Sequence, residues 1–221
     1  MKRIALCVLA ACGDNAAGGD ATNASDAHGI DADAAAMPDL TLLGEHMADS
    51  FVLTNDSFAP DSCEVQEQCV VGAGPRRLLR FDTVTANLGT TDLVLGTPPP
   101  RGVSDATFTW SPCHLHHHVL GYAVYELRDG NGVVLTSHKQ AFCLQDIQQI
   151  RAGAPSHGYS CTHQGMSAGW ADVYGRALPC QWIDVTEVPA GSYTLRIVVN
   201  PAFTLPDSDP SNNELTFPVM L

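Results

Sequence analysis

Residues 191–200 read GSYTLRIVVN, and this stretch decides the fold. Side chains of an extended chain alternate between two faces, so Tyr193, Leu195, Ile197 and Val199 share one face. A half-apolar alternation of this kind is typical of a β-strand that lies against a core. The stretch therefore predicts a strand with one buried face.

Similar features recur along the chain from about residue 38 onward. Strands are expected at residues 77–82, 84–88, 92–95, 119–127, 133–136 and 214–221. The Asp-Gly-Asn-Gly sequence at residues 129–132 predicts a hairpin turn, and one or two helical turns are expected within residues 140–150. Short strands separated by Gly-, Pro- and Asn-rich turns predict an all-β, β-sandwich-like single domain over residues 38–221, with long loops and little helix.

The N-terminal region has a different character. Residues 1–11 join a basic start to a short apolar run that ends in Leu-Ala-Ala, and Cys12 follows directly. This pattern predicts a bacterial lipoprotein-type signal peptide, with Cys12 as the lipid-anchored residue. Residues 12–37 are rich in Ala, Gly and Asp and contain almost no large apolar side chain, which predicts a flexible tether.

The composition indicates which partners and which cellular compartment to expect. The 221 residues are 45% hydrophobic and carry a net charge of −13, so nucleic acid is excluded as a partner because phosphate binding needs a basic face. Six cysteines follow the tether, an even number that predicts disulfides in an exported chain. Cys63 and Cys69 are close enough to bridge one loop, and the other four can pair in three ways.

Four of the nine histidines lie within residues 114–118, which read HLHHH. On a strand, His114, His116 and His118 would project from one face and His117 from the other. Three neighbouring imidazoles are a common site for copper, zinc, iron or nickel. We therefore expect a transition-metal site at these three residues, with His117 outside the ligand set.

Four blocks of the sequence together resemble one family. WSPCHLHHH, SHKQAFCLQD, GMSAGWADVYGRALPCQWIDVTEVPAGSYTLRIVVNP and LPDSDPSNN resemble, in this order, the catalytic domain of lysyl oxidase. The similarity extends from about Cys63 to the C-terminus. It implies Cu(II) bound by His114, His116 and His118, and a lysine tyrosylquinone cofactor made from Lys139 and Tyr174.

The resemblance also implies the reaction. A primary amine, which can be a lysine side chain of a protein, would be converted to an aldehyde, while dioxygen would yield hydrogen peroxide and ammonia would be released. Such chemistry needs a base near the operating pH. Asp146 and His163 are the candidates for that base, and each has an alternative role, Asp146 as a loop cap and His163 as a neighbour of the metal ligands.

A second ion site is implied near the C-terminus. Residues 205–213 concentrate oxygen ligands of the kind that Ca²⁺ binds, although such a turn can also be held by its own side-chain hydrogen bonds. The family resemblance implies calcium, bound by Asp207, Asp209, Asn212 and Asn213 with Glu67 and the Gln68 carbonyl. This ion would join the C-terminal turn to the Cys63–Cys69 loop.

The chain also departs from the family pattern. It has fewer cysteines than the animal enzymes, so two pairings of the last four remain open: Cys143–Cys161 with Cys113–Cys180, or Cys113–Cys161 with Cys143–Cys180. Two other functions also remain: a non-catalytic metal-binding surface module and a zinc hydrolase that uses the same histidines. Only the oxidase needs both Lys139 and Tyr174.

Overall fold

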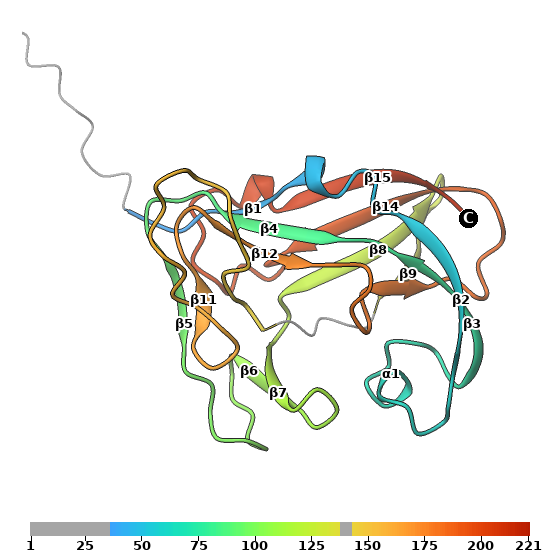
Figure 1. Cartoon of the computed structure of the whole chain (residues 1–221). Coiled ribbons are helices and arrows are strands. Elements are labelled where there is room, and N and C mark those ends of the chain that lie inside the picture. Colours follow the sequence, from blue (N-terminus) through green and yellow to red (C-terminus); the bar gives the residue numbers. More distant parts are fainter. Residues whose placement is uncertain (1–35, 138–142) are drawn as a thin grey trace, which may run out of the picture. The chain divides into compact units, whose positions relative to one another are not determined.

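The computed structural model describes residues 36–137 and 143–221. The expected signal peptide, nearly all of the expected tether, and Lys139 lie outside the described residues (Figure 1). No helix in the described part is long and apolar enough to cross a membrane.

Short strands make up most of the described chain, and the few helices are single turns. The helical turns are η1 (Gly44–His46), α1 (Cys63–Gln66) and η2 (Pro210–Asn212). The strands are β1 (Leu40–Leu42), β2 (Val52–Phe58), β3 (Gly74–Arg80), β4 (Thr83–Asn87), β5 (Leu93–Gly96), β6 (Phe108–Ser111), β7 (His116–Val119), β8 (Ala123–Asp129), β9 (Gly132–Thr136), β10 (Gln148–Gln149), β11 (Gln164–Met166), β12 (Trp170–Tyr174), β13 (Trp182–Asp184), β14 (Ser192–Val199) and β15 (Glu214–Met220).

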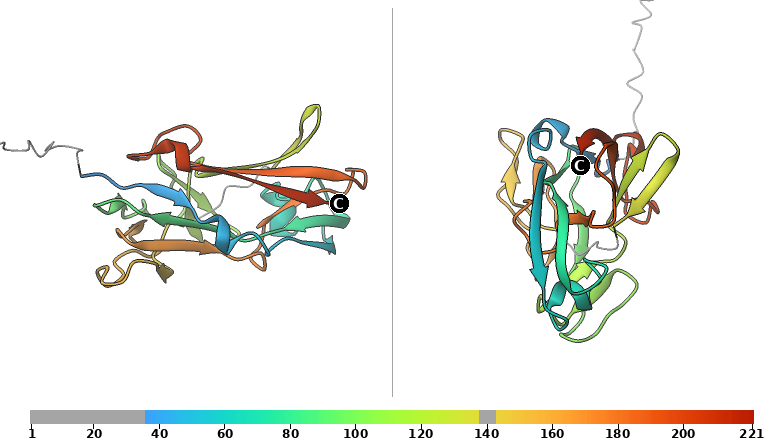
Figure 2. Two further views of the ribbon diagram at one scale, coloured as in Figure 1. Left: turned by 90° about the horizontal axis from the view of Figure 1, so that it is seen from above. Right: turned by 90° about the vertical axis from the view of Figure 1, so that its right-hand side faces the viewer.

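Two four-stranded antiparallel sheets enclose the main core. Their strand orders are β1-β4-β12-β10 and β15-β14-β8-β9 (Figure 2). Leu195, Ile197 and Val199 of β14 are fully buried and pack in one cluster with residues of β1, β4 and β8. The all-β prediction is confirmed. The prediction that residues 191–200 form a strand with one buried face is also confirmed.

A three-stranded sheet, β13-β3-β2, has a small core of its own. Trp182 of β13 packs there with Leu78 and with the disulfide partners Cys69 and Cys180, while Phe58 and Val65 close the edge. Since Val65 belongs to α1, this second core holds the α1 turn in place. The same turn contributes to the histidine site described below.

The disulfides differ in part from the sequence expectation. Cys63 is bonded to Cys113, Cys69 to Cys180, and Cys143 to Cys161. The expected Cys63–Cys69 bridge is wrong. Cys63 begins the α1 turn, Cys69 lies three residues beyond its end, and each has its Cα atom within 5.5 Å of a distant partner. Of the expected pairs, Cys143–Cys161 is confirmed, whereas Cys113–Cys180, Cys113–Cys161 and Cys143–Cys180 are not formed.

Two expected elements also differ. The strand expected over residues 119–127 is divided, because Gly121 has a φ of +65° and turns the chain between β7 and β8. The helical turns expected within residues 140–150 are absent from its described part. There the chain pairs with β12 instead, with the Ile147 N–H donating to the Ala171 carbonyl and β10 continuing the ladder.

Candidate metal centre and adjoining pocket

The three predicted histidines converge, although not as three positions of one strand. β7 begins at His116, and Leu115 has a φ of +58°, so His114 lies in the turn between β6 and β7. One ligand atom from each of His114, His116 and His118 lies within 4.8 Å of the others. The structure brings the three side chains together, but a left-handed residue and not strand alternation brings His114 back to the other two.

The geometry of this trio fits a transition-metal ion. His114 Nδ1 lies 3.2 Å from His118 Nε2, and the rings of His116 and His118 are 4.8 Å apart. Neutral imidazole nitrogens gathered this closely suit copper or zinc. His117 points elsewhere, because its Nε2 atom lies 2.8 Å from the Val103 carbonyl oxygen. Its expected place outside the ligand set agrees with this contact.

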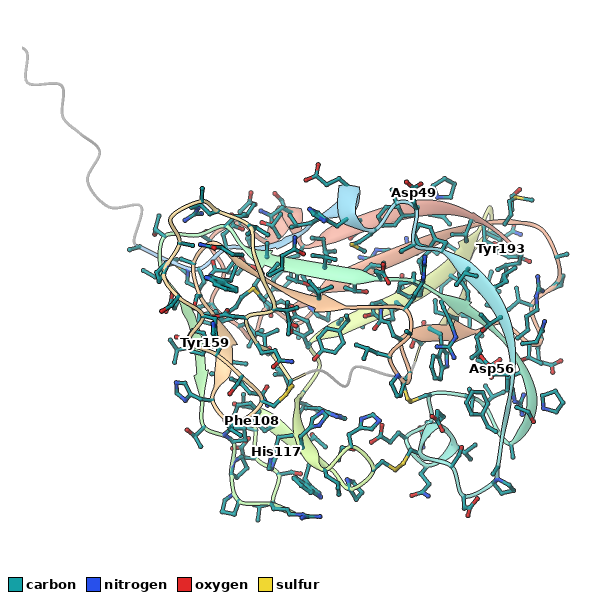
Figure 3. The ribbon with its side chains drawn as sticks, viewed as in Figure 1. Asp49, Asp56, Phe108, His117, Tyr159 and Tyr193 are labelled. Atoms are coloured by element: carbon teal, nitrogen blue, oxygen red, sulfur yellow. A yellow bond between two sulfur atoms is a disulfide. The ribbon has the colours of Figure 1, made fainter. Side chains whose placement is uncertain are left out.

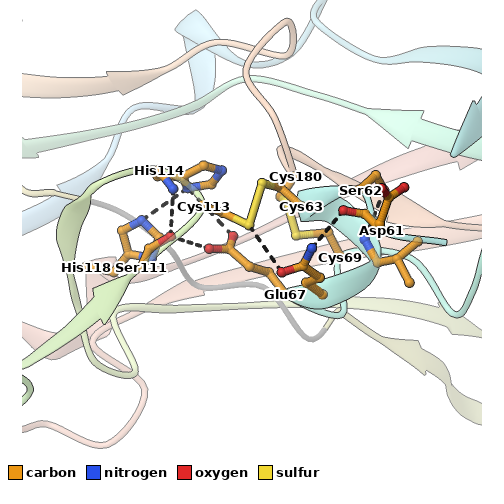
Figure 4. Close-up of a disulfide and its surroundings, with 12 residues drawn as sticks. Asp61, Ser62, Cys63, Glu67, Cys69, Ser111, Cys113, His114, His118 and Cys180 are labelled. Atoms are coloured by element: carbon orange, nitrogen blue, oxygen red, sulfur yellow. Dashed lines mark hydrogen bonds and ion pairs between the residues drawn. A yellow bond between two sulfur atoms is a disulfide. The ribbon is translucent and has the colours of Figure 1, made fainter. Parts of the chain in front are cut away.

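An acidic residue lies beside the histidines. The Glu67 carboxylate is 3.6 Å from His114 Nδ1, and its other oxygen accepts a hydrogen bond from the Ser111 hydroxyl (Figure 4). Ser111 Oγ in turn accepts the backbone N–H of His114 at 2.9 Å. Cys180 Sγ is also close to Glu67 and His114, but it is bonded to Cys69 and so offers no thiolate.

A pocket of about 450 Å³ opens beside the trio. Two of the histidines form part of its wall and Tyr174 forms another part. The described lining residues are His114, His116, Cys143, Gln145, Ile147, Cys161, Asp172, Val173, Tyr174, Leu178 and Pro179. The pocket therefore brings two of the predicted metal ligands and the predicted cofactor tyrosine to one space.

Tyr174 is held at the end of β12. Its hydroxyl donates a hydrogen bond to the Cys143 carbonyl at 2.7 Å. Burial raises the pKa of the Tyr174 phenol well above its usual value, and the nearby Asp172 carboxylate raises it further. The protein surroundings alone therefore keep this phenol protonated.

Lys139, the other predicted cofactor residue, lies outside the described residues. The two candidate bases are described, and neither is among the residues that line the pocket. Asp146 accepts hydrogen bonds from the N–H groups of Gly158, Tyr159 and Ser167 and from the Ser167 hydroxyl. Its carboxylate holds a loop, which is the alternative role expected from the sequence.

His163 makes its contacts outside the residues that line the pocket. Its Nδ1 atom is 3.3 Å from the Thr97 hydroxyl, and its ring stacks on Tyr159. The imidazole is not part of the lining. Asp172, which sequence reasoning missed, does line the pocket. The ADVY sequence carried the signal, because Asp172 and Tyr174 are two positions apart on one strand.

The predicted calcium residues separate into two groups. Asp207 accepts the Leu40 N–H and the Asn213 side-chain amide, and the Asn212 amide donates to Asp39. The C-terminal turn is thus joined to the start of β1. Glu67 and Gln68 do not join this turn, because Glu67 is held at His114 and α1 lies at the opposite edge of the molecule from β1 (Figure 1).

The comparisons with known proteins agree with the geometry. A family model described as Lysyl oxidase matches residues 44–220, so the chain belongs to the lysyl oxidase family. The resemblance seen in four sequence blocks is confirmed, and the match begins earlier than Cys63.

Several curated relatives show the same similarity. Lysyl oxidase homolog 2 of Rattus norvegicus is 34% identical over 189 residues, which are 80% of this chain and 23% of that protein. Protein-lysine 6-oxidase of Homo sapiens is 32% identical over 195 residues, covering 80% of this chain and 44% of the human protein. The chain therefore spans less than half the length of these relatives.

Proposed function

We propose that this protein is a copper- and quinone-dependent amine oxidase. It would convert primary amines, including lysine side chains of proteins, to aldehydes, with dioxygen as the oxidant and hydrogen peroxide and ammonia as products. The observation that carries the proposal is the single pocket lined by His114, His116 and Tyr174. Membership of the lysyl oxidase family supports it.

Different residues of the chain would bind the copper and form the quinone. His114, His116 and His118 would hold Cu(II), and Tyr174 together with Lys139 would supply the lysine tyrosylquinone. Copper and the quinone would provide the oxidation chemistry that side chains alone lack. Lys139 is four residues before Cys143 in the sequence, and the Cys143 carbonyl accepts the Tyr174 hydroxyl.

The pocket walls would orient the substrate and exclude water. Ile147, Val173, Leu178 and Pro179 give the lining an apolar part that suits the methylene chain of an alkylamine. The net charge of −13 would attract a cationic amine or a lysine-rich chain. Both features favour amines over anionic substrates.

The proposal is tested with protein produced in the presence of copper and oxygen. We expect a visible absorption band, reaction with a hydrazine, and a peptide in which Lys139 is cross-linked to Tyr174 by mass spectrometry. Tyr174→Phe should abolish all three and also peroxide release from amines, while copper still binds. Lys139→Met should do the same.

Tyr193→Phe is the matched control. Tyr193 also donates its hydroxyl to a backbone carbonyl, that of Pro189, and it lies far from His117 (Figure 3). Tyr193 is not among the residues that line the pocket. This variant should keep the colour and the activity. Copper binding without any quinone in the parent protein would overturn the proposal and favour a non-catalytic metal-binding module, and metal-dependent hydrolysis with zinc would favour a hydrolase.

We further propose that the protein is exported. The three disulfides support an oxidising compartment, since such bonds are rare in the cytosol. The signal at residues 1–11 and the lipid anchor at Cys12 belong to the same proposal. Mass spectrometry of the membrane-extracted N-terminus would test it, and an unmodified Cys12 in a full-length cytosolic chain would contradict it.

We also propose a structural calcium ion at the C-terminal turn. The Oδ1 atoms of Asn212 and Asn213 are buried and have no hydrogen-bond partner among the described residues. Buried acceptors are normally satisfied, so two orphaned oxygens beside Asp207 fit a bound cation. Asp39 takes the place that the sequence reading gave to Glu67 and Gln68.

A further inference from the structure

Asp172 is the acidic side chain of the pocket wall. It lies on β12 two residues before Tyr174, so both side chains project from the same face of the strand. Asp172 is 2% exposed, yet it lines the same pocket as Tyr174 and His114. A carboxylate is therefore buried against the space in which the proposed cofactor and substrate would meet.

The hydrogen bonds of this carboxylate are few. Its Oδ2 atom accepts the Gln145 N–H at 3.4 Å, and its Oδ1 atom has no hydrogen-bond partner within residues 36–137 and 143–221. Asp146, by contrast, is also buried but accepts four hydrogen bonds that fix a loop. Asp172 is thus poorly explained as a structural residue, because buried acceptors are rarely left unpaired.

The electrostatic surroundings make Asp172 a stronger base than an ordinary aspartate. Burial raises its pKa well above the usual value, N–H groups of Gln145 and Val173 oppose this, and Asp146 adds to it. A carboxylate that binds its proton more tightly is a better proton acceptor near neutral pH. Perturbed carboxylates in pockets are frequent at functional sites.

We propose that Asp172 is the catalytic base that removes a proton from the amine-bearing carbon of the substrate. This assignment rests on the proposed amine oxidase function. In the step, the C–H bond breaks, the proton is transferred to Asp172, and the electron pair is taken up by the cofactor that dioxygen later reoxidises. The carbon leaves as the aldehyde carbon after hydrolysis.

The other two acidic or basic candidates fit this step less well. Asp146 has its carboxylate oxygens occupied by four donors, and His163 is engaged with Thr97 and Tyr159 outside the lining. Asp172 alone among the three lines the pocket. Asp172 and Tyr174 also lie on the same strand, so the sheet holds the proposed base at a fixed separation from the proposed cofactor residue.

The experiment uses copper-loaded full-length protein and Asp172→Asn, which keeps the size of the side chain. We expect the quinone content, measured as hydrazine adduct per protein, to equal that of the parent. The kcat for benzylamine should fall by about 100- to 10,000-fold. The deuterium isotope effect on kcat, with α-dideuterated benzylamine, should rise to its full value because C–H cleavage becomes rate-limiting.

A second variant and a control complete the test. Asp172→Glu retains a carboxylate and should recover part of kcat, whereas Asp184→Asn changes a buried carboxylate outside the pocket lining and should leave kcat and quinone content unchanged. In metal-free parent protein, infrared difference spectra against Asp172→Asn should show a carboxyl band that titrates at higher pH than that of an ordinary aspartate.

The outcomes separate this inference from the proposed function. If the parent forms no quinone, the proposed function fails before Asp172 is tested. If the parent is active and Asp172→Asn keeps the parental kcat, or if Asp172→Asn forms no quinone, the assignment of the base is overturned while the oxidase stands. A raised KM with unchanged kcat would also overturn it, because that result describes a binding residue.

Discussion

The Glu67 carboxylate lies 3.6 Å from the Nδ1 atom of His114, and it reaches that position from the C-terminal end of α1. A negative charge beside a metal-binding imidazole stabilises the bound cation and orients the ring. Ser111 supports both partners, since its hydroxyl donates to Glu67 and its oxygen accepts the His114 N–H. Glu67 therefore adjoins the candidate metal centre.

Replacing this carboxylate should weaken copper binding. We expect Glu67→Gln to lower copper affinity by about 10- to 100-fold, as removal of a supporting partner of a histidine ligand does in other metal sites. Competition with a chromophoric chelator measures the change. Glu64→Gln, on the same helical turn, is the control and should bind copper like the parent. Equal affinity of Glu67→Gln and parent would remove Glu67 from the site.

The Cys63–Cys113 bridge ties the same two segments together. It joins the start of α1 to the residue before His114, with the Cα atoms 5.5 Å apart. Replacing both cysteines by serine should lower the free energy of unfolding by about 3 kcal/mol, since a long loop is released in the unfolded chain. Urea denaturation measures this change.

The same double variant should also bind copper more weakly at temperatures where it is fully folded, because Glu67 is then less firmly held at His114. Parental copper affinity in the folded variant would show that the bridge stabilises the chain without shaping the site. The Cys69–Cys180 bridge lies within the second core, so its removal should also lower stability.

The fold was predictable where local pattern decides structure. Alternation identified β14, and the Asp-Gly-Asn-Gly turn identified the β8–β9 hairpin, because turn chemistry and side-chain periodicity act over a few residues. β1 and β13 are only three residues long, too short to show a period. They exist because neighbouring strands supply their hydrogen bonds.

The site was predictable only in part for the same reason. The spacing of His114, His116 and His118 is local, and the family resemblance supplied Tyr174. The position of Glu67 depends on a disulfide that spans 50 residues, and no short-range rule predicts such a contact. Asp172 is distinguished from other aspartates only by burial, which the sequence does not show.

Asp172 should make stability depend on pH. The pKa of Asp172 is raised in the folded protein. The contribution of this group to the free energy of unfolding is therefore fully present below the pKa of the unfolded aspartate, about 3.9, and is lost as pH rises through the folded pKa. The groups that share its electrostatic surroundings are Asp146, Tyr122, Tyr125 and Tyr174. The three phenols stay protonated over this range, because burial raises their pKa.

Asp172→Asn removes this dependence. We expect the metal-free variant to be more stable than the parent near neutral pH, with the melting temperature raised by about 2–4 °C for each kcal/mol of relieved penalty. The difference in stability between Asp172→Asn and the parent should disappear as pH falls toward 4. Urea midpoints measured across the pH range test this, and a gap that is constant with pH would contradict it.

Calcium should stabilise the folded protein through the C-terminal turn. Asp207 holds the Leu40 N–H, Asn212 donates to Asp39, and the Oδ1 atoms of Asn212 and Asn213 have no protein partner in the described part of the chain. An ion that binds only the folded state at 100 times its dissociation constant adds about 2.7 kcal/mol of stability. A chelator should therefore lower the melting temperature by about 5–10 °C.

Three variants test which residues bind this ion. Asp39→Asn should reduce the effect of the chelator, because Asp39 borders the turn, whereas Glu67→Gln should leave it unchanged, because Glu67 lies at His114. Asp207→Ala should abolish it. A chelator effect that survives Asp207→Ala but disappears in Glu67→Gln would place the ion at the histidine site, and the turn would then be held only by the hydrogen bonds between its own side chains and β1.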